Sequence, residues 1–141
     1  MSTIKEIQEE IVDEFAMFDD WMQRYEYMID LGKSLPLIDE KYKTEEYIIK
    51  GCQSKVWVHA DMKDGKVAFT ADSDAIITKG IIAILIRAFS NQPPQAILDA
   101  DTSFIDEIGL KEHLSPTRAN GLVSMIKQIK LYAVAYQTQL N

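Results

Sequence analysis

The side chain best suited to covalent chemistry in this chain is its single cysteine, Cys52. It lies in the small polar segment 50–55, which interrupts two apolar segments, whereas a buried structural cysteine is expected within an apolar stripe. Gly51 allows a turn with positive φ that would point the sulfur outward. Lys50 and Lys55 add two cations, which favour thiolate over thiol. The segment predicts a reactive cysteine on an exposed loop, with an inert structural cysteine as the alternative. The sequence leaves open whether the resting thiol is tucked into a pocket or exposed.

The chemistry open to Cys52 is limited by what does not accompany it. One cysteine cannot complete a disulfide or peroxidase cycle within the chain, nor can it build a cysteine zinc site. A cysteine hydrolase needs an oriented histidine beside the sulfur. His59 follows seven residues later in an expected strand, and the sequence does not place His113. A lone thiol suits a group that is carried covalently and handed on. A small cysteine hydrolase using Cys52 and His113 is the alternative from another class.

The elements that position this cysteine can be predicted from the spacing of the apolar residues. That spacing is helical at the start of the chain, strand-like in the middle and helical again at the end. Residues 3–18 have apolar side chains every three or four positions, which predicts an amphipathic helix that begins with a capping box. A second helix is expected from Asp19 or Asp20, as N-cap, to Gly32, as C-cap. The segment 33–46 has no period and is expected to be a connecting loop.

A β-hairpin is expected immediately after the cysteine segment. Residues 56–62 alternate with period two, and Asp64-Gly65 is a strong signal for a two-residue turn. Such a turn sets a register in which the numbers of paired residues sum to 129, and both strands then place their apolar side chains on one face. Residues 47–49 are expected to form a third strand.

The rest of the chain is expected to be helical. A strongly apolar helix over 75–89, capped by Ser73 or Asp74, is expected at the centre of the fold. Short helical turns follow, and Ser115-Pro116 predicts a cap with proline at the first position of a long helix. Residues 1–141 therefore predict a single α+β domain, in which a small antiparallel sheet of about three strands packs against helices.

The hairpin register also predicts a neighbour for the cysteine loop. Extending the pairs to a sum of 129 places Lys55 opposite Asp74, so the loop and the turn 72–74 should lie side by side. Asp74 is first of all expected to be a helix N-cap, and we expect the turn also to restrain the loop until a partner docks. Arg118, one turn into the last helix, is a candidate for the same site, with a solvated surface position as the alternative.

Composition and charge exclude several classes of partner. The chain has 141 residues and a net charge of −7, which disfavours binding to nucleic acid through phosphates. Its longest apolar stretch, residues 81–86, is far shorter than the ~20 residues needed to cross a bilayer. The N-terminus lacks the basic region and apolar core of a secretory signal. These features predict a cytoplasmic protein that binds no membrane.

Three segments of the chain match the motifs of one known family. Residues 51–57 (GCQSKVW) resemble the GCQSxVW signature of SufE, the family of sulfur acceptors in iron–sulfur cluster assembly. Residues 72–75 (DSDA) with Lys79-Gly80 resemble its DSDA and KG segment. Residues 113–118 (HLSPTR) with residues 120–122 (NGL) resemble its HLSPxRxxGL segment. The resemblance covers nearly the whole chain in the right order, and the family shares its fold with the U-type iron–sulfur scaffolds.

The resemblance implies a sulfur carrier that is not itself an enzyme. A SufS-type cysteine desulfurase, which holds the pyridoxal phosphate, forms a persulfide on its own cysteine, and Cys52 takes over that sulfur. The carrier stimulates the desulfurase and delivers sulfur to a SufBCD-type scaffold complex. By the same resemblance this chain binds no cofactor, and a scaffold role is excluded because one cysteine cannot hold a cluster. No metal site is predicted, although binding through His59, His113 and carboxylates stays open, since these residues have no recognisable ligand spacing. Besides Cys52, the implied loop and interface residues are Gly51, Gln53, Ser54, Asp72, Asp74 and Arg118. A paralogous acceptor for another desulfurase remains an alternative, and the sequence leaves monomer and homodimer open.

Overall fold

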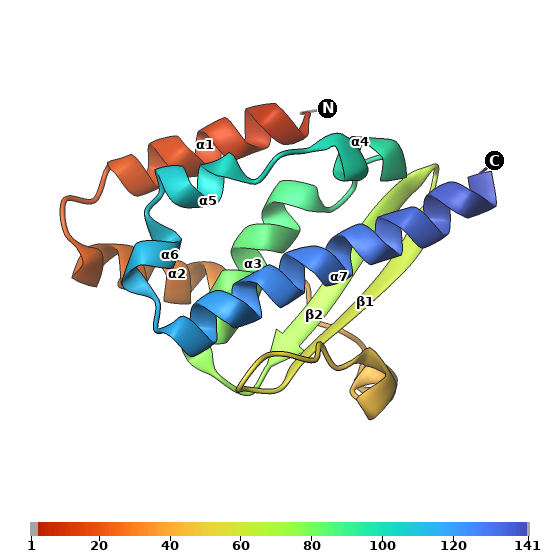
Figure 1. The fold of residues 1–141 in the computed structure, drawn as a ribbon, viewed down its shortest axis with the longest axis horizontal. Coiled ribbons are helices and arrows are strands. Elements are labelled where there is room, and N and C mark those ends of the chain that lie inside the picture. The colour runs from red at the N-terminus through yellow and green to blue at the C-terminus, as the bar shows by residue number, and fades with distance from the viewer. Residues whose placement is uncertain (1–2, 141) are drawn as a thin grey trace.

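The computed structural model describes residues 3–140 (Figure 1). Seven helices, two short 3₁₀ turns and one antiparallel hairpin make up this part of the chain. In chain order they are α1 (Ile4–Ala16), α2 (Trp21–Lys33), η1 (Glu40–Tyr42), η2 (Glu45–Tyr47), β1 (Val56–Lys63), β2 (Lys66–Ser73), α3 (Ile76–Phe89), α4 (Pro94–Asp99), α5 (Ser103–Glu107), α6 (Leu110–His113) and α7 (Pro116–Leu140). The fold is α+β, as the sequence predicts.

The apolar helix α3 is the centre of the packing. It contacts α1, α2, α7 and β2, and ten of its residues are buried. Its start differs from the expectation, because Ala75 is the N-cap and no side chain caps the helix. The Ser73 hydroxyl accepts from the Ala75 N–H at 3.2 Å, while the Asp74 carboxylate binds elsewhere. The prediction that Ser73 or Asp74 caps this helix is therefore wrong.

The hairpin has the predicted register. Pairs run from Lys63 with Lys66 to Val56 with Ser73, and every pair sums to 129. Asp64 and Gly65 both have positive φ, at 54° and 79°. This is the requirement of the tight turn that matches the twist of two antiparallel strands.

The expected third strand is not formed, so the sheet of the described residues has two strands. Residues 47–49 make a single bridge, Ile48 with Trp57, and the Ile49 N–H donates to the Val56 carbonyl at 2.8 Å. Pairing stops there because side chains of α7 bind the next outward-facing carbonyls of β1. The Tyr132 hydroxyl donates to Val58 at 2.9 Å, and the Tyr136 hydroxyl donates to Ala60 at 2.7 Å.

The segment after α2 covers the other edge of the hairpin. The Ala71 N–H donates to the Pro36 carbonyl at 3.0 Å, and the Ile38 N–H donates to the Ala71 carbonyl at 3.1 Å. Unpaired strand edges are open to other chains, and both edges of this hairpin are at least partly covered. The predicted connecting loop is therefore fixed to β2, and it contains the turn η1 and the start of η2.

Two helix boundaries differ in part from the sequence expectation. The capping box of α1 is present, but the helix ends at Ala16 and excludes Phe18. Asp20 caps α2 as expected, by accepting from the Gln23 N–H. The expected C-cap Gly32 lies inside α2, whose C-cap is Ser34. Gly32 is buried, and a Cβ there would lie 3.1 Å from the backbone of Gly80 in α3, so close helix packing accounts for this glycine.

The long helix α7 begins as predicted at Ser115-Pro116, where the Ser115 hydroxyl accepts from the Arg118 N–H at 3.3 Å. It runs along the hairpin, and its first turns lie at the same end of the molecule as the cysteine loop (Figure 1). Among residues 3–140, neither this helix nor any other is long and apolar enough to span a bilayer.

We expect Tyr132→Phe to lower the free energy of unfolding by about 1–2 kcal/mol, because the change leaves the Val58 carbonyl without its donor. Burial raises the pKa of Tyr132 to about 12, so the hydroxyl is a donor throughout the neutral range. Urea denaturation gives the value. Leu131→Ala, at a neighbouring side chain that is half exposed, is the control and should cost clearly less. Equal losses in the two variants would contradict the role given to the hydroxyl.

Candidate functional site

Cys52 lies half-buried between the hairpin and the first turns of α7. Its thiol donates a long hydrogen bond to the Gly121 carbonyl, with 3.6 Å between sulfur and oxygen. Cys52 borders a cavity of about 40 Å³, which is lined by residues 52–54, by Thr78 and Ile81 of α3, and by four residues of α7. The thiol therefore points inward, toward the space between α3 and α7.

Two glycines allow the cysteine loop to approach α7 so closely. A Cβ on Gly121 would lie 3.3 Å from the Cys52 sulfur, which is tighter than an ordinary contact. Gly51 has a φ of +96°, and a Cβ there would lie 2.5 Å from the Ser124 hydroxyl oxygen. Gly51 was a predicted site residue, whereas the role of Gly121 was missed. An isolated glycine inside a helical pattern is the sequence signal that could have indicated a close approach.

The loop is largely exposed, as expected, and the thiol, whose resting position the sequence leaves open, is half-buried. The expectation that the neighbouring lysines lower the pKa of the thiol is wrong. Burial raises the pKa of Cys52, because the thiolate would lose its hydration in the cavity. Lys50 and Lys55 are exposed, so their charges remain in water, whereas Cys52 is half-buried. In this arrangement the thiol is sheltered, and less of it is thiolate at neutral pH than in an unstructured peptide.

The predicted contact between the loop and the turn 72–74 is confirmed. The Asp74 N–H donates to the Lys55 carbonyl at 3.2 Å, and the Lys55 N–H donates to the Asp74 carboxylate at 3.1 Å. The Ser73 hydroxyl also donates to the Lys55 carbonyl, at 2.8 Å. Three hydrogen bonds thus fix the end of the loop three residues after Cys52.

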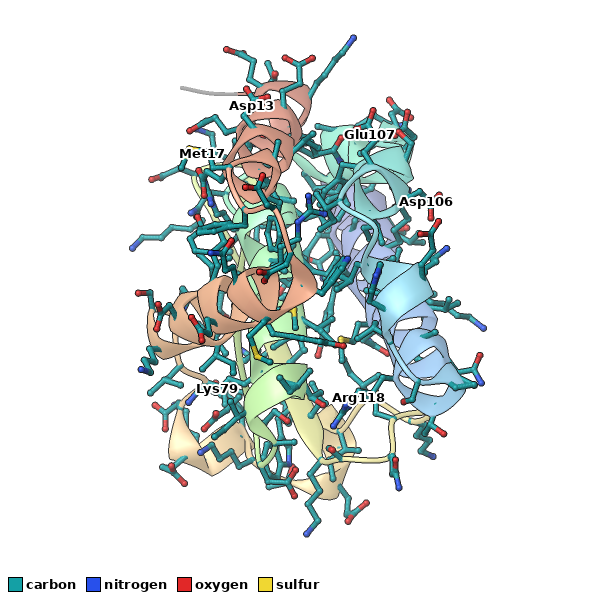
Figure 2. All side chains as sticks on the ribbon, turned by 90° about the vertical axis from the view of Figure 1, so that its left-hand side faces the viewer. Asp13, Met17, Lys79, Asp106, Glu107 and Arg118 are labelled. Carbon is teal, nitrogen blue, oxygen red and sulfur yellow. The ribbon has the colours of Figure 1, made fainter. Side chains whose placement is uncertain are left out.

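The remaining predicted residues divide into two groups. Gln53, Ser54 and Arg118 line the same cavity as Cys52, with the exposed Arg118 side chain coming from α7. Asp72 does not line the cavity and binds lysines behind the turn. In the view of Figure 2, Arg118 and Lys79 lie on opposite sides of α3.

Neither histidine lines the cavity of Cys52. His113 stacks on Trp21, with ring centroids 3.9 Å apart, and its Nδ1 is 3.1 Å from the Gly109 carbonyl. His59 stacks on Tyr42, again at 3.9 Å. The hydrolase alternative therefore lacks a base at the sulfur in this arrangement. Within residues 3–140 no three side chains of His, Cys, Asp or Glu are grouped to hold a metal ion.

We expect Gly121→Ala to expose the thiol, because the new methyl group competes with the sulfur for the same space. Alkylation of Cys52 by iodoacetamide should become faster, while stability changes by no more than about 1 kcal/mol, since alanine favours the helix. Asn120→Ala, at an exposed position in the same turn, should leave the rate unchanged. Alkylation of the Gly121 variant at the wild-type rate would show that the contact does not shelter the sulfur.

The raised pKa of Cys52 predicts a pH dependence. Only the thiolate is alkylated, so the isolated protein should react more slowly at neutral pH than an unstructured cysteine peptide does. The rate should also reach half of its maximum at a higher pH than that of the peptide, whose thiol has a pKa of about 8.5. Stopped-time alkylation followed by mass spectrometry measures both profiles. A half-maximal rate reached at the same pH as in the peptide, or at a lower pH, would contradict the sheltered thiol.

Comparison with known proteins supplies a family for this site. The family model described as SufE, Fe-S metabolism associated domain, matches residues 9–133. An uncharacterized SufE-like protein of Rhizobium meliloti is 44% identical over 127 residues, covering 86% of this chain and 91% of the relative. SufE-like protein 1 of Arabidopsis thaliana, named as chloroplastic/mitochondrial, is 37% identical over 127 residues, covering 89% of this chain but 34% of the relative.

A solved structure shares the fold. The solution structure of a hypothetical protein from Thermus thermophilus superposes with a TM-score of 0.78 at 21% identity, covering 94% of this chain and 96% of that one. The family model spans most of the chain, including the cysteine loop, the turn 72–74 and most of α7. This chain belongs to the SufE family.

Proposed function

We propose that Cys52 accepts sulfur as a persulfide from a pyridoxal-phosphate cysteine desulfurase of SufS type and carries it to an iron–sulfur scaffold complex of SufBCD type. One observation carries the proposal: a lone thiol lies sheltered beside a cavity that can hold one more sulfur atom. Membership of the SufE family supports a desulfurase as the partner.

The size of the cavity suits a persulfide. A cavity that holds one water molecule needs a volume of roughly 10–15 Å³. The cavity beside Cys52 has a volume of about 40 Å³. A sulfur atom added to Cys52 therefore has room without displacing α3 or α7. In that position the outer sulfur is protected from reductants and from other thiols.

The transfer is a balanced thiol–disulfide exchange. The Cys52 thiolate attacks the outer sulfur of the persulfide on the desulfurase, a new sulfur–sulfur bond forms, and the desulfurase cysteine leaves as a thiolate. Neither an oxidant nor a reductant is needed. The chain has no second cysteine that could attack the new persulfide and release the sulfur as sulfide.

Transfer also requires the loop to leave its sheltered position. The inward thiol with its raised pKa is a poor nucleophile, so docking must turn residues 51–54 outward. Asp74 is exposed next to the loop and Arg118 is exposed at the mouth of the cavity. We assign both to the interface with the desulfurase, together with Gly51, Gln53, Ser54 and Asp72.

The remaining assignments follow from this role. Residues 1–141 act as one domain that accepts sulfur and stimulates the desulfurase, and the pyridoxal phosphate stays on the partner. We place the protein in the cytoplasm, where such assembly takes place in a reducing environment. A paralogous acceptor that serves another desulfurase is the second candidate, since the family resemblance extends to those proteins.

The test combines the purified chain with a SufS-type desulfurase and cysteine. We expect mass spectrometry to show one added sulfur atom on Cys52 and sulfide release by the desulfurase to increase. Cys52→Ser should abolish both effects, whereas His113→Ala should keep them, because His113 is stacked on Trp21 away from the cavity. Stimulation by Cys52→Ser, or no added sulfur on the wild-type chain, would refute the proposal.

A further inference from the structure

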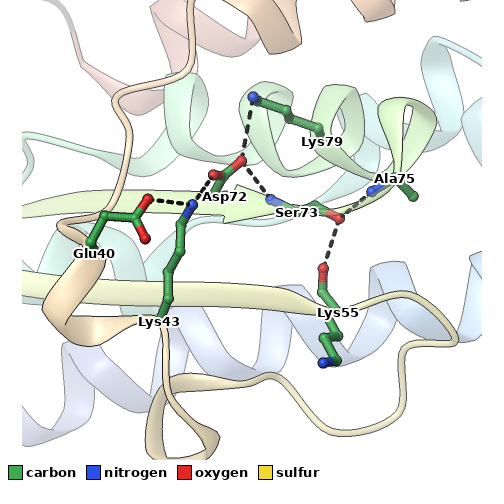
Figure 3. A network of polar contacts seen from close by, with 7 residues as sticks. All are labelled: Glu40, Lys43, Lys55, Asp72, Ser73, Ala75 and Lys79. Atoms are coloured by element: carbon green, nitrogen blue, oxygen red, sulfur yellow. Dashed lines mark hydrogen bonds and ion pairs between the residues drawn. The ribbon is translucent and has the colours of Figure 1, made fainter.

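A network of charged side chains lies behind the turn that holds the cysteine loop (Figure 3). The Asp72 carboxylate, at the end of β2, binds the Lys43 ammonium at 2.6 Å and the Lys79 ammonium at 3.3 Å. It also accepts from the Ser73 N–H at 2.8 Å. Lys43 in turn binds Glu40 at 3.1 Å.

The contact between Lys43 and Asp72 is more sheltered than a typical surface ion pair. The side chain of Lys43 is 22% exposed and that of Asp72 is 13% exposed. Burial by itself would raise the pKa of Asp72, but the bonds from Lys43, the Ser73 N–H and Lys79 together lower it. Asp72 is therefore ionised at neutral pH, and removing a partner would leave a partly desolvated carboxylate.

Asp72 is covalently next to the residues that hold the loop. Ser73 and Asp74 make the three hydrogen bonds to Lys55 described above. A chain of contacts thus runs from Lys43 through Asp72 and the turn 72–74 to the cysteine loop, as the dashed bonds in Figure 3 show as far as Lys55.

Lys43 itself comes from a segment with independent anchors. Tyr42 stacks on His59 of β1, with an interplanar angle of 8°. Ile38 is hydrogen-bonded to Ala71 of β2. These contacts hold the segment 36–43 on the hairpin without Lys43. Lys43 also contacts Glu40 and lies over the Trp57 ring, but its contact with the turn 72–74 is the one with Asp72.

We propose that Lys43 is a positioning residue for sulfur transfer: by holding Asp72 it fixes the turn 72–74, and this keeps the Cys52 loop in its sheltered position. The role in sulfur transfer rests on the proposed function. The effect of Lys43 on the position of the loop concerns the isolated protein alone. Lys79 supports the same carboxylate from α3, at the longer distance.

Loss of Lys43 should loosen the loop and hydrate the sulfur. The charged side chain that lines the cavity is Arg118 of α7, and Lys50 and Lys55 are exposed on the loop. None of these changes in a Lys43 variant. A shift in the titration of Cys52 would therefore report the position of the loop and not a change in the charges beside it.

The experiment compares Lys43→Met with Lys41→Met in the isolated full chain. Both variants remove one lysine from the same segment, but Lys41 lies over the Tyr42 ring and is exposed. We expect Lys43→Met to alkylate at Cys52 about threefold faster at neutral pH, which corresponds to a fall of about 0.5 in kinetic pKa. Lys41→Met should match the wild type, and Lys43→Arg should restore the slower rate because it keeps the charge.

Hydrogen exchange of residues 50–55 is the second readout, and it should be faster in Lys43→Met only. If Lys43→Met is poorly folded, Asp72→Asn, which keeps the shape of the side chain, replaces it with the same expected changes. An unchanged kinetic pKa and unchanged exchange in a folded variant would overturn the proposal. Neither measurement uses a desulfurase, so failure here is separate from a failure of sulfur transfer to Cys52.

Discussion

The sulfur of Cys52 rests on the backbone of α7, and the rest of the site depends on that contact. The contact requires a residue without a side chain at position 121, and it requires α7 to have a fixed position along the hairpin. Tyr132 and Tyr136 fix the position of α7 along the hairpin, because their hydroxyls donate to two carbonyls of β1. Buried apolar residues of α7 also pack into the core with α3. The tyrosines therefore fill the edge of the sheet and also place the helix against which the thiol is sheltered.

Shelter and reactivity oppose each other at this sulfur. In the proposed function burial protects the sulfur atom that Cys52 carries, but it also raises the pKa of the thiol, and each tenfold loss of thiolate corresponds to about 1.4 kcal/mol. Three hydrogen bonds to Lys55 retain the end of the loop, and a typical bond contributes about 1 kcal/mol. The free energy of these three hydrogen bonds together is small compared with the interaction energy of an ordinary protein interface. Docking of a partner can therefore supply the energy that turns the loop outward.

Local patterns in the sequence predicted the elements and part of the site. Alternation and the Asp64-Gly65 turn specified the hairpin register, and that register correctly placed Lys55 beside Asp74. The inward direction of the sulfur was not predictable, because it arises from a contact between residues 69 positions apart. The third strand failed for the same reason: residues 47–49 have strand character, but tyrosines from α7 already bind the edge. Local propensity is decisive only where no distant segment competes for the same groups.

The segment 33–46 was described from sequence only as an aperiodic connection, yet it supplies Lys43 to the turn beside the site. Loops carry function when a rigid scaffold positions them, and stacking of Tyr42 on His59 provides that support here. The turn 72–74 then serves in two ways. Asp72 faces the lysines, while Asp74 is exposed beside the loop. In the proposed function a desulfurase that binds the Asp74 carboxylate competes with the backbone N–H of Lys55, which donates to that carboxylate. Docking itself therefore weakens the hydrogen bonds that retain the loop. Release of the thiol is thereby coupled to the presence of the donor, and the sulfur stays sheltered when no partner is bound.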